Sequence, residues 1–223
     1  MREGRLVIGT RRYSSGSLRG WLAVRLAGLD VSEQLIPLAD NGQTAAIATL
    51  SPNGKVPYLE HKGIAVWESL ALCEYCAELA PGLWPADARA RAHARSIASE
   101  MHAGFRALRV AMPMNTGRIN RPLAGGTTPE IDADITRIDA IWTEARLDFG
   151  KGGDFLFGAQ FGMADAMFAP IVSRFLSYGV MPPSPQSQAY MAAVRAHPLV
   201  AQWYDQAAQE PVAWQQSRFE GMA

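Results

Sequence analysis

The sequence has little of what marks secreted, membrane or nucleic-acid-binding proteins. Its 223 residues include two cysteines, too few for a disulfide framework. No apolar run approaches the length of a transmembrane helix, and the run at 6–8 is too short for the core of a signal peptide. Acidic and basic residues balance at 21 each, whereas a nucleic acid or an anionic membrane favours a basic excess. We therefore predict a cytoplasmic protein with no nucleic-acid or membrane partner.

Metal-binding and redox patterns are also missing. The histidines are scattered without ligand spacing and are His61, His93, His102 and His197. Cys73 and Cys76 have the spacing of a redox pair, but such pairs occupy the first strand-to-helix turn, and here a predicted helix contains them. We predict no metal site and interpret the two cysteines as core residues, with a redox role as the alternative.

The first eighty residues alternate between strand and helix patterns. Short apolar runs at 6–9, 34–38, 56–60 and 64–67 predict strands. Helical spacing appears at 18–29 and 68–80, with a short helix at 44–50. Parallel strands that alternate with helices and end in a hairpin are typical of a small α/β domain. The stretch 81–87, which contains Pro and Gly, follows as a linker.

From residue 88 onward only helical patterns appear. Ile97, Met101, Phe105, Leu108 and Met112 share one face of a single long helix that ends before Pro113. Further helices are predicted at 129–149, 163–177, 186–196 and 198–209. The predicted fold is therefore an α/β domain over 1–80 joined to an all-helical domain over 88–223.

The first candidate site is the serine-rich segment between the first strand and the first helix. Ser14 and Ser15 lie where a helix N-terminus presents unpaired N–H groups and a partial positive charge. A thiolate is stabilised at such a place, and a hydroxyl there can donate to it and lower the pKa of the thiol. The alternative is that these serines only cap the helix.

Two further candidate sites lie beyond the break at 51–54. Pro57 enters a predicted strand, where it removes a ladder donor, and a cis peptide between Val56 and Pro57 is one explanation. That bend would offer the backbone of Val56 to an extended ligand, although an ordinary edge strand is the alternative. Glu68 and Ser69 open a helix, where they fit the α-amino-acid end of a γ-glutamyl group or serve as capping residues.

Taken together, these motifs resemble glutathione transferases, and most closely the serine-type bacterial and zeta-like branch. The motifs are Ser14-Ser-Gly-Ser-Leu-Arg, Pro52-Asn-Gly-Lys-Val-Pro57, Glu68-Ser69 and Gly162-Met-Ala-Asp165. The resemblance covers nearly the whole chain and implies a thioredoxin-like βαβαββα domain, a C-terminal helical bundle and a homodimer. It departs from the zeta pattern at Gly16, where the isomerases of that branch have Cys, and Gly162 leaves the helix-capping box of Asp165 half empty.

The resemblance also assigns roles within a glutathione site. Ser14, with Ser15 as the near alternative, matches the hydroxyl that activates the thiol. Val56 beside a cis Pro57 would pair with the cysteinyl unit, and Glu68 with Ser69 would hold the γ-glutamyl end. Lys55 and Gln43 would reach the glycyl carboxylate. The pocket for the second substrate is expected on and after the first long helix of the helical domain, and its predicted lining is His102, Arg106, Met112 and Asn115.

Three functions remain open from the sequence. The leading hypothesis is a transferase that conjugates glutathione, a co-substrate used without a metal, to a hydrophobic electrophile, as in detoxification. The second is a glutathione-dependent cis–trans isomerase of a maleyl-type diacid, with arginines near 106–118 binding the carboxylates. The third is a non-catalytic protein that carries ligands in the same groove.

Overall fold

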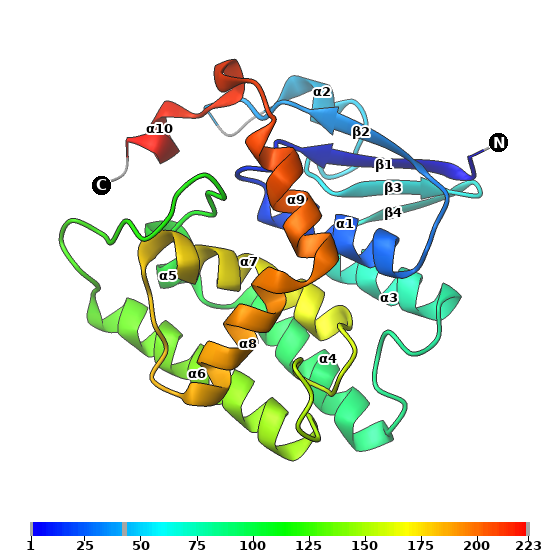
Figure 1. The fold of residues 1–223 in the computed structure, drawn as a ribbon. Helices are drawn as coiled ribbons and strands as arrows, with labels where there is room; N and C mark the ends of the chain where they lie inside the picture. The colour runs from blue at the N-terminus through cyan, green and yellow to red at the C-terminus, as the bar shows by residue number, and fades with distance from the viewer. Residues whose placement is uncertain (1, 42–43, 222–223) are drawn as a thin grey trace.

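The computed structural model describes residues 2–41 and 44–221, and its first part is built on a four-stranded mixed sheet (Figure 1). The strand order is β2–β1–β3–β4, with β1 parallel to β2 and the other neighbours antiparallel. The strands are β1 (Gly4–Gly9), β2 (Ser32–Ile36), β3 (Tyr58–His61) and β4 (Ile64–Trp67). The helices between and after them are α1 (Ser15–Leu26), α2 (Ala45–Ala48) and α3 (Ser69–Leu79). This order confirms the predicted thioredoxin-like fold.

Alternation along β1 gives the sheet two apolar faces. Successive side chains of a strand point to opposite sides. Leu6 and Ile8 belong to the main core, whereas Val7 packs in a small second cluster with Ile36 and with Ile47 of α2. Figure 1 shows α1 and α3 on the side of the sheet that faces the later helices. The sheet is thus covered on both faces, and its main core opens toward the helical part.

The rest of the described chain is helical, as predicted. Its helices are α4 (Ala88–Ala103), α5 (Arg106–Ala111), α6 (Pro129–Asp148), α7 (Met163–Tyr178), α8 (Pro185–Ala196), α9 (Pro198–Ala208), a 3₁₀ turn (Val212–Trp214) and α10 (Ser217–Glu220). The central α7 contacts α1, α3, α4 and α8. One core therefore runs from Leu18 of α1 and Leu72 of α3 to Met167 and Phe168 of α7.

The prediction of a single long helix from 97 to 112 is wrong. α4 ends at Ala103, and α5 begins only at Arg106. Between them Gly104 is a poor helix former, and Phe105 adopts a left-handed backbone with φ of 57°. The new helix start is satisfied from outside, because the Leu108 N–H donates to the Asp134 carboxylate at 3.0 Å.

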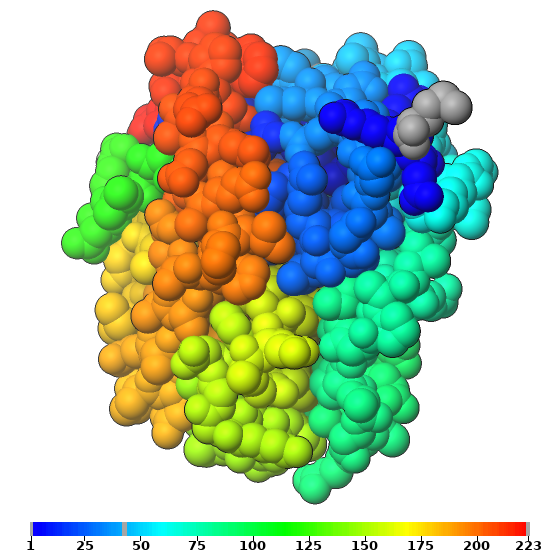
Figure 2. Space-filling view, turned by 45° about the vertical axis from the view of Figure 1, so that its right-hand side comes forward, coloured from blue at the N-terminus to red at the C-terminus, as the bar shows by residue number. Residues whose placement is uncertain are grey.

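Other boundaries differ by less. β2 covers 32–36 rather than 34–38. α3 ends at Leu79 and α4 begins at Ala88, while the domain bounds 1–80 and 88–223 with their linker stay a prediction. Of the described helices, none is long and apolar enough to cross a bilayer. Figure 2 shows α9 and the C-terminal segment lying against the N-terminal part of the molecule, an arrangement also visible in Figure 1.

Candidate active site

The junction of β1 and α1 presents a helix N-terminus whose positive end is not neutralised. Ser14 is the N-cap, and its Oγ accepts the Ser17 N–H at 3.3 Å and donates to the Ser17 Oγ at 2.7 Å. The Ser17 Oγ in turn accepts the Gly9 N–H at 2.9 Å. No acidic residue lies in the first turn of α1, so its partial positive charge is available to an anion. Ser14 thus caps the helix here, and Ser15, half-buried one residue later, has no side-chain hydrogen bond within the described part of the chain.

The turn before β3 packs directly on this helix start. The Val56–Pro57 peptide bond is cis, which confirms the sequence expectation. A Cβ added to Gly16 would lie 2.9 Å from the Val56 carbonyl oxygen, and one added to Gly20 would lie 2.7 Å from the Pro57 ring. Only glycine allows α1 to approach this closely, since contacts below 3.0 Å demand a shift. Val56 is half-buried, and no protein partner for its backbone N–H or C=O is found among residues 2–41 and 44–221.

The start of α3 holds Glu68 in a strained conformation. Glu68 has φ 70° and ψ 129°, a region that residues with a Cβ rarely adopt, at a cost of about 1–3 kcal/mol. Its Oε1 accepts from the Asn53 Nδ2 at 2.9 Å, and Asn53 Oδ1 accepts the Lys55 N–H at 3.0 Å. Ser69 follows as the first helical residue and is buried. The loop that carries Lys55 and Val56 is thereby joined to Glu68 and Ser69.

The structure therefore brings the described glutathione-site candidates together around the N-terminal ends of α1 and α3. Lys55 is exposed at the edge of this group and has no side-chain partner within the described residues. Gln43 lies outside the described residues, so its predicted role stays a prediction.

The predicted second-substrate residues divide into two groups. His102 and Arg106 flank the break between α4 and α5, and His102 Nε2 lies 3.7 Å from the Glu68 Oε2. Met112 and Asn115, by contrast, are each only 1% exposed. Met112 belongs to the main core, and Asn115 donates to Glu220 at 3.2 Å.

Three arginines form the most unusual feature of this region: Arg109 lies within the predicted 106–118 stretch, whereas Arg19 and Arg174 were not selected as site residues. Arg19 of α1, Arg109 of α5 and Arg174 of α7 lie close enough to one another to interact, and Arg19 and Arg174 are 3% and 5% exposed. Arg19 donates to the Met167 carbonyl at 3.1 Å, and Arg174 donates to the carbonyls of Arg109 and Met112.

None of the three arginines forms an ion pair with a carboxylate in the described part of the chain. Arg19 Nη2 and Arg174 Nε are buried without a hydrogen-bond partner there. Burial, the neighbouring Arg19 and then Arg109 lower the pKa of Arg174. Burial, then Arg19 and Arg109, likewise lower the pKa of His102, against the opposite effect of Glu68. The cluster has the charge and the unused donors to hold an anion.

A cavity of about 340 Å³ adjoins this cluster. It is lined by Ala103, Gly104, Arg106, Arg109, Val110 and Arg174. The available sequence signal for Arg174 was a charged residue in the middle of the mostly apolar α7, because such a residue is rarely buried without a partner.

Two other sequence interpretations concern structure rather than chemistry. Asp165 accepts the N–H groups of Gly162 at 2.8 Å and Leu156 at 3.1 Å, and it lacks a reciprocating side chain at 162, as expected. Burial raises the pKa of Asp165 to about 6. Cys73 and Cys76 are free and buried inside α3. No group of His, Cys, Asp or Glu suited to a metal ion occurs among the residues that the structure describes.

Comparison with known proteins agrees with this architecture along most of the chain. The family model "Glutathione S-transferase, N-terminal domain" matches residues 13–79, and "Glutathione S-transferase, C-terminal domain" matches residues 128–206. Maleylacetoacetate isomerase of Mus musculus is 34% identical over 182 residues, which cover 78% of this chain and 80% of the mouse protein. The chain belongs to the glutathione S-transferase superfamily. The resemblance to glutathione transferases predicted from the sequence is thereby confirmed.

Solved glutathione S-transferase structures share the fold. Maleyl pyruvate isomerase, described as a bacterial glutathione S-transferase of the zeta class, superposes with a TM-score of 0.69 at 22% identity, covering 93% of this chain and 99% of that one. A glutathione transferase homologue from Burkholderia, solved with bound glutathione, gives a TM-score of 0.69 at 21% identity, covering 94% of this chain and all of that one. At these identities the likeness establishes the fold of this family member.

Proposed function

We propose that this glutathione S-transferase family member binds glutathione along the Val56–Pro57 turn, with the sulfur at the N-terminus of α1. The unpaired backbone of Val56 suits an extended peptide added like a strand. Glu68 would accept from the γ-glutamyl ammonium, and Ser69 and the N-terminus of α3 would meet its carboxylate. Lys55, and Gln43 with it, would face the glycyl carboxylate.

The reaction that we propose is the cis–trans isomerisation of a maleyl-type diacid. The observation that carries this choice is the cluster of buried Arg19, buried Arg174 and half-buried Arg109, none of which has a carboxylate partner in the described chain. A hydrophobic electrophile would leave these guanidinium groups unpaired, whereas a substrate with two carboxylates would pair with them. The names of the mammalian relatives agree with this preference over the transferase hypothesis.

The chemistry uses the glutathione thiolate as a reversible nucleophile. The thiolate adds to one alkene carbon of the substrate, a C–S bond forms, and the π electrons move to the conjugated carbonyl oxygen as an enolate. Rotation about the resulting single bond follows. The enolate then expels the thiolate, which restores the double bond in the trans form. Ser14 or Ser15 would stabilise the thiolate, and the arginines would bind the carboxylates and favour the enolate.

The test is turnover of maleylacetoacetate with glutathione, followed by the appearance of the trans isomer and by titration of free thiol. We expect trans product with no net loss of thiol. Arg174→Gln should raise KM about 10-fold or more, because a charge-assisted contact is lost, while glutathione affinity stays unchanged. The matched control is Arg89→Gln, since Arg89 is exposed at the far end of α4. Absence of trans product in wild type would refute the isomerase proposal.

Conjugation to an electrophile is the second candidate. It is favoured by Val110, which lines the same cavity and is 68% exposed, an apolar wall beside the arginines. This activity would consume one thiol for each product formed. Binding of glutathione without either activity, and without a lowered thiol pKa, would instead support a carrier.

We also propose that the chain forms a homodimer in the cytoplasm. Its edge strand β4 exposes Ile64 and Trp67, which are 50% and 42% exposed. An exposed apolar edge strand is a template for pairing with another chain, and exposed apolar patches mark interaction sites. Sedimentation of the purified protein tests this: a monomer at micromolar concentration would contradict it.

A further inference from the structure

The C-terminal segment 210–220 returns to the loops around the candidate active site and bonds to them through side chains. Glu210 accepts the backbone N–H groups of Arg11 at 2.6 Å and Arg12 at 3.2 Å. These residues belong to the loop that leads from β1 into Ser14. The contacts join parts of the chain about two hundred residues apart, so local folding alone does not explain them.

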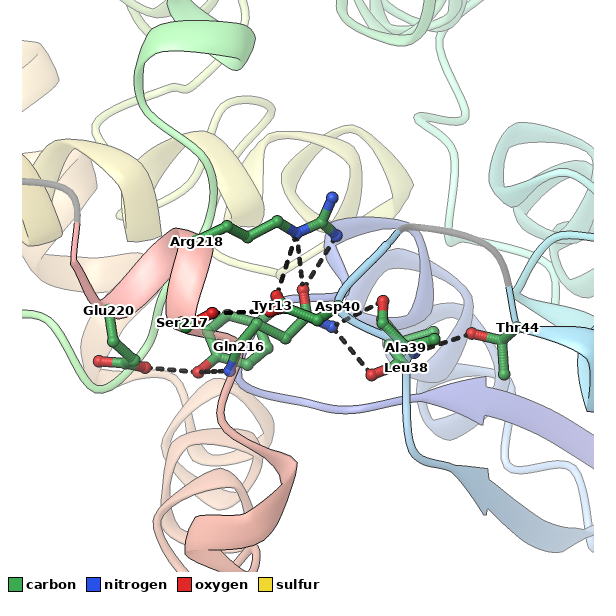
Figure 3. A network of polar contacts seen from close by, with 9 residues as sticks. All are labelled: Tyr13, Leu38, Ala39, Asp40, Thr44, Gln216, Ser217, Arg218 and Glu220. Carbon is green, nitrogen blue, oxygen red and sulfur yellow. Dashed lines mark hydrogen bonds and ion pairs between the residues drawn. The ribbon is translucent and has the colours of Figure 1, made fainter.

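Glu220 makes a second connection to the same loop. Its Oε1 accepts from the Tyr13 hydroxyl and, at 3.2 Å, from the Asn115 Nδ2, and Arg12 Nη1 lies 3.7 Å away. The Tyr13 hydroxyl also accepts the Gln216 N–H at 3.1 Å, and the Tyr13 ring lies 5.3 Å from that of Phe219. One carboxylate thus contacts both the residue before Ser14 and Asn115 of the predicted second-substrate pocket. Figure 3 shows its contact with Tyr13.

Gln216 and Ser217 hold the loop that follows β2. Gln216 Nε2 donates to the Leu38 carbonyl at 3.0 Å, and the Ser217 Oγ donates to Asp40 at 2.7 Å. Figure 3 shows the Leu38 and Ala39 carbonyls at the side-chain end of Gln216 and the Tyr13 hydroxyl at its backbone nitrogen. This loop leads toward α2, on the side where the proposed glycyl end of glutathione lies. The segment therefore spans two of the loops that frame the groove.

We propose that residues 210–220 are a positioning element for the active site, in which Glu220 orients the Tyr13–Ser15 segment and Gln216 orients the loop after β2. The Tyr13 hydroxyl donates its one proton to Glu220 and accepts the Gln216 N–H, so Tyr13 is a positioning residue rather than the thiol-activating hydroxyl. The inference rests on the proposed function only for its turnover measurements. The proposal predicts that Glu220 and Gln216 affect different properties, namely turnover and glutathione affinity.

The separation is tested with Glu220→Gln and Gln216→Ala. Glu220→Gln removes a charge that receives two hydrogen bonds and should lower kcat about 10-fold, with glutathione affinity changed less than about 2-fold. Gln216→Ala removes neutral bonds to the loop after β2 and should weaken glutathione binding about 5-fold, with little change in kcat. Glu78→Gln, an exposed carboxylate on α3 with no side-chain partner within the described residues, is the matched control.

A second pair of measurements keeps the test independent of folding defects and of turnover. Tyr13→Phe retains the ring and its contact with Phe219, and it should reproduce the effect of Glu220→Gln without adding to it in the double variant. Hydrogen exchange at 10–14 should accelerate in Glu220→Gln, and at 38–41 in Gln216→Ala, even if no substrate is turned over. The proposal would be overturned if Glu220→Gln and Gln216→Ala had the same hydrogen exchange and kinetics as the control Glu78→Gln. It would also be overturned if these two variants changed every measured property equally. Failure of wild type to isomerise the diacid would overturn only the proposed function.

Discussion

Replacing Glu68 with Gly should leave the protein as stable as wild type or more stable, and should weaken glutathione binding. The strained backbone at φ 70° and ψ 129° costs about 1–3 kcal/mol, which Gly relieves. Two effects destabilise the Gly variant. The lost hydrogen bond to Asn53 costs about 0.5–1.5 kcal/mol, and the greater freedom of Gly in the unfolded chain costs about 0.4–1 kcal/mol. The two sides nearly cancel. The lost carboxylate should raise the dissociation constant of glutathione about 10-fold or more.

Comparison with Glu68→Ala isolates the strain. Ala loses the same carboxylate but keeps the unfavourable backbone, so we expect it to be about 1–2 kcal/mol less stable than Gly in urea unfolding. Glu78 is an exposed position within α3. There the Ala variant should be more stable than the Gly variant, because Ala favours a helix over Gly by about 1 kcal/mol. If Ala is at least as stable as Gly at position 68, the strain argument is refuted. If both variants bind glutathione within about 2-fold of wild type, Glu68 does not hold the γ-glutamyl end.

Three further predictions follow from the described contacts. Gly20→Ala should destabilise the protein by about 1–2 kcal/mol in urea unfolding, because its Cβ would lie 2.7 Å from Pro57. Gly125→Ala, with open space around it, should be nearly neutral. Equal values for the two variants would contradict the close packing at Gly20. Of Ser14→Ala and Ser15→Ala, the one that removes the activating donor should raise the pKa of the bound thiol by about one unit, ~1.4 kcal/mol, read from thiolate absorbance against pH; no change in either would exclude both hydroxyls. Burial raises the pKa of Asp165 above its ordinary value to about 6, so the folded state holds the proton more tightly and the contribution of Asp165 to stability is lost as pH rises from about 4 to 6. Over that window wild type should lose about 2–3 kcal/mol relative to Asp165→Asn, and parallel pH profiles would disprove the coupling.

Local chemistry made much of the fold predictable. Pro57 after a glycine turn made a cis bond one of two interpretations, and Ser14 before an apolar helix made a cap one of two, because both depend on neighbours in sequence. The interruption at Phe105 was missed because four flanking apolar positions keep helical spacing through it, while the left-handed turn is stabilised by Asp134 of another helix.

The parts of the site that could not be predicted depend on distant contacts. Arg174 meets Arg19 and Arg109 only because α7 packs between the sheet-covering helices and α4. Glu220 meets Tyr13 across an interval of 207 residues. Periodicity carries no information about such pairs, since it reports one element at a time.

The unbroken core from α1 and α3 into α7 also determines how the molecule comes apart. Leu18, Leu72 and Phe168 are each fully buried, and all three belong to a single packed cluster. Removing the helical part would expose the apolar face of α1 and α3 to water, so neither half has a complete interior of its own. Heat or denaturant should therefore melt both halves in one cooperative transition, and either half produced alone in a cell would depend on chaperones.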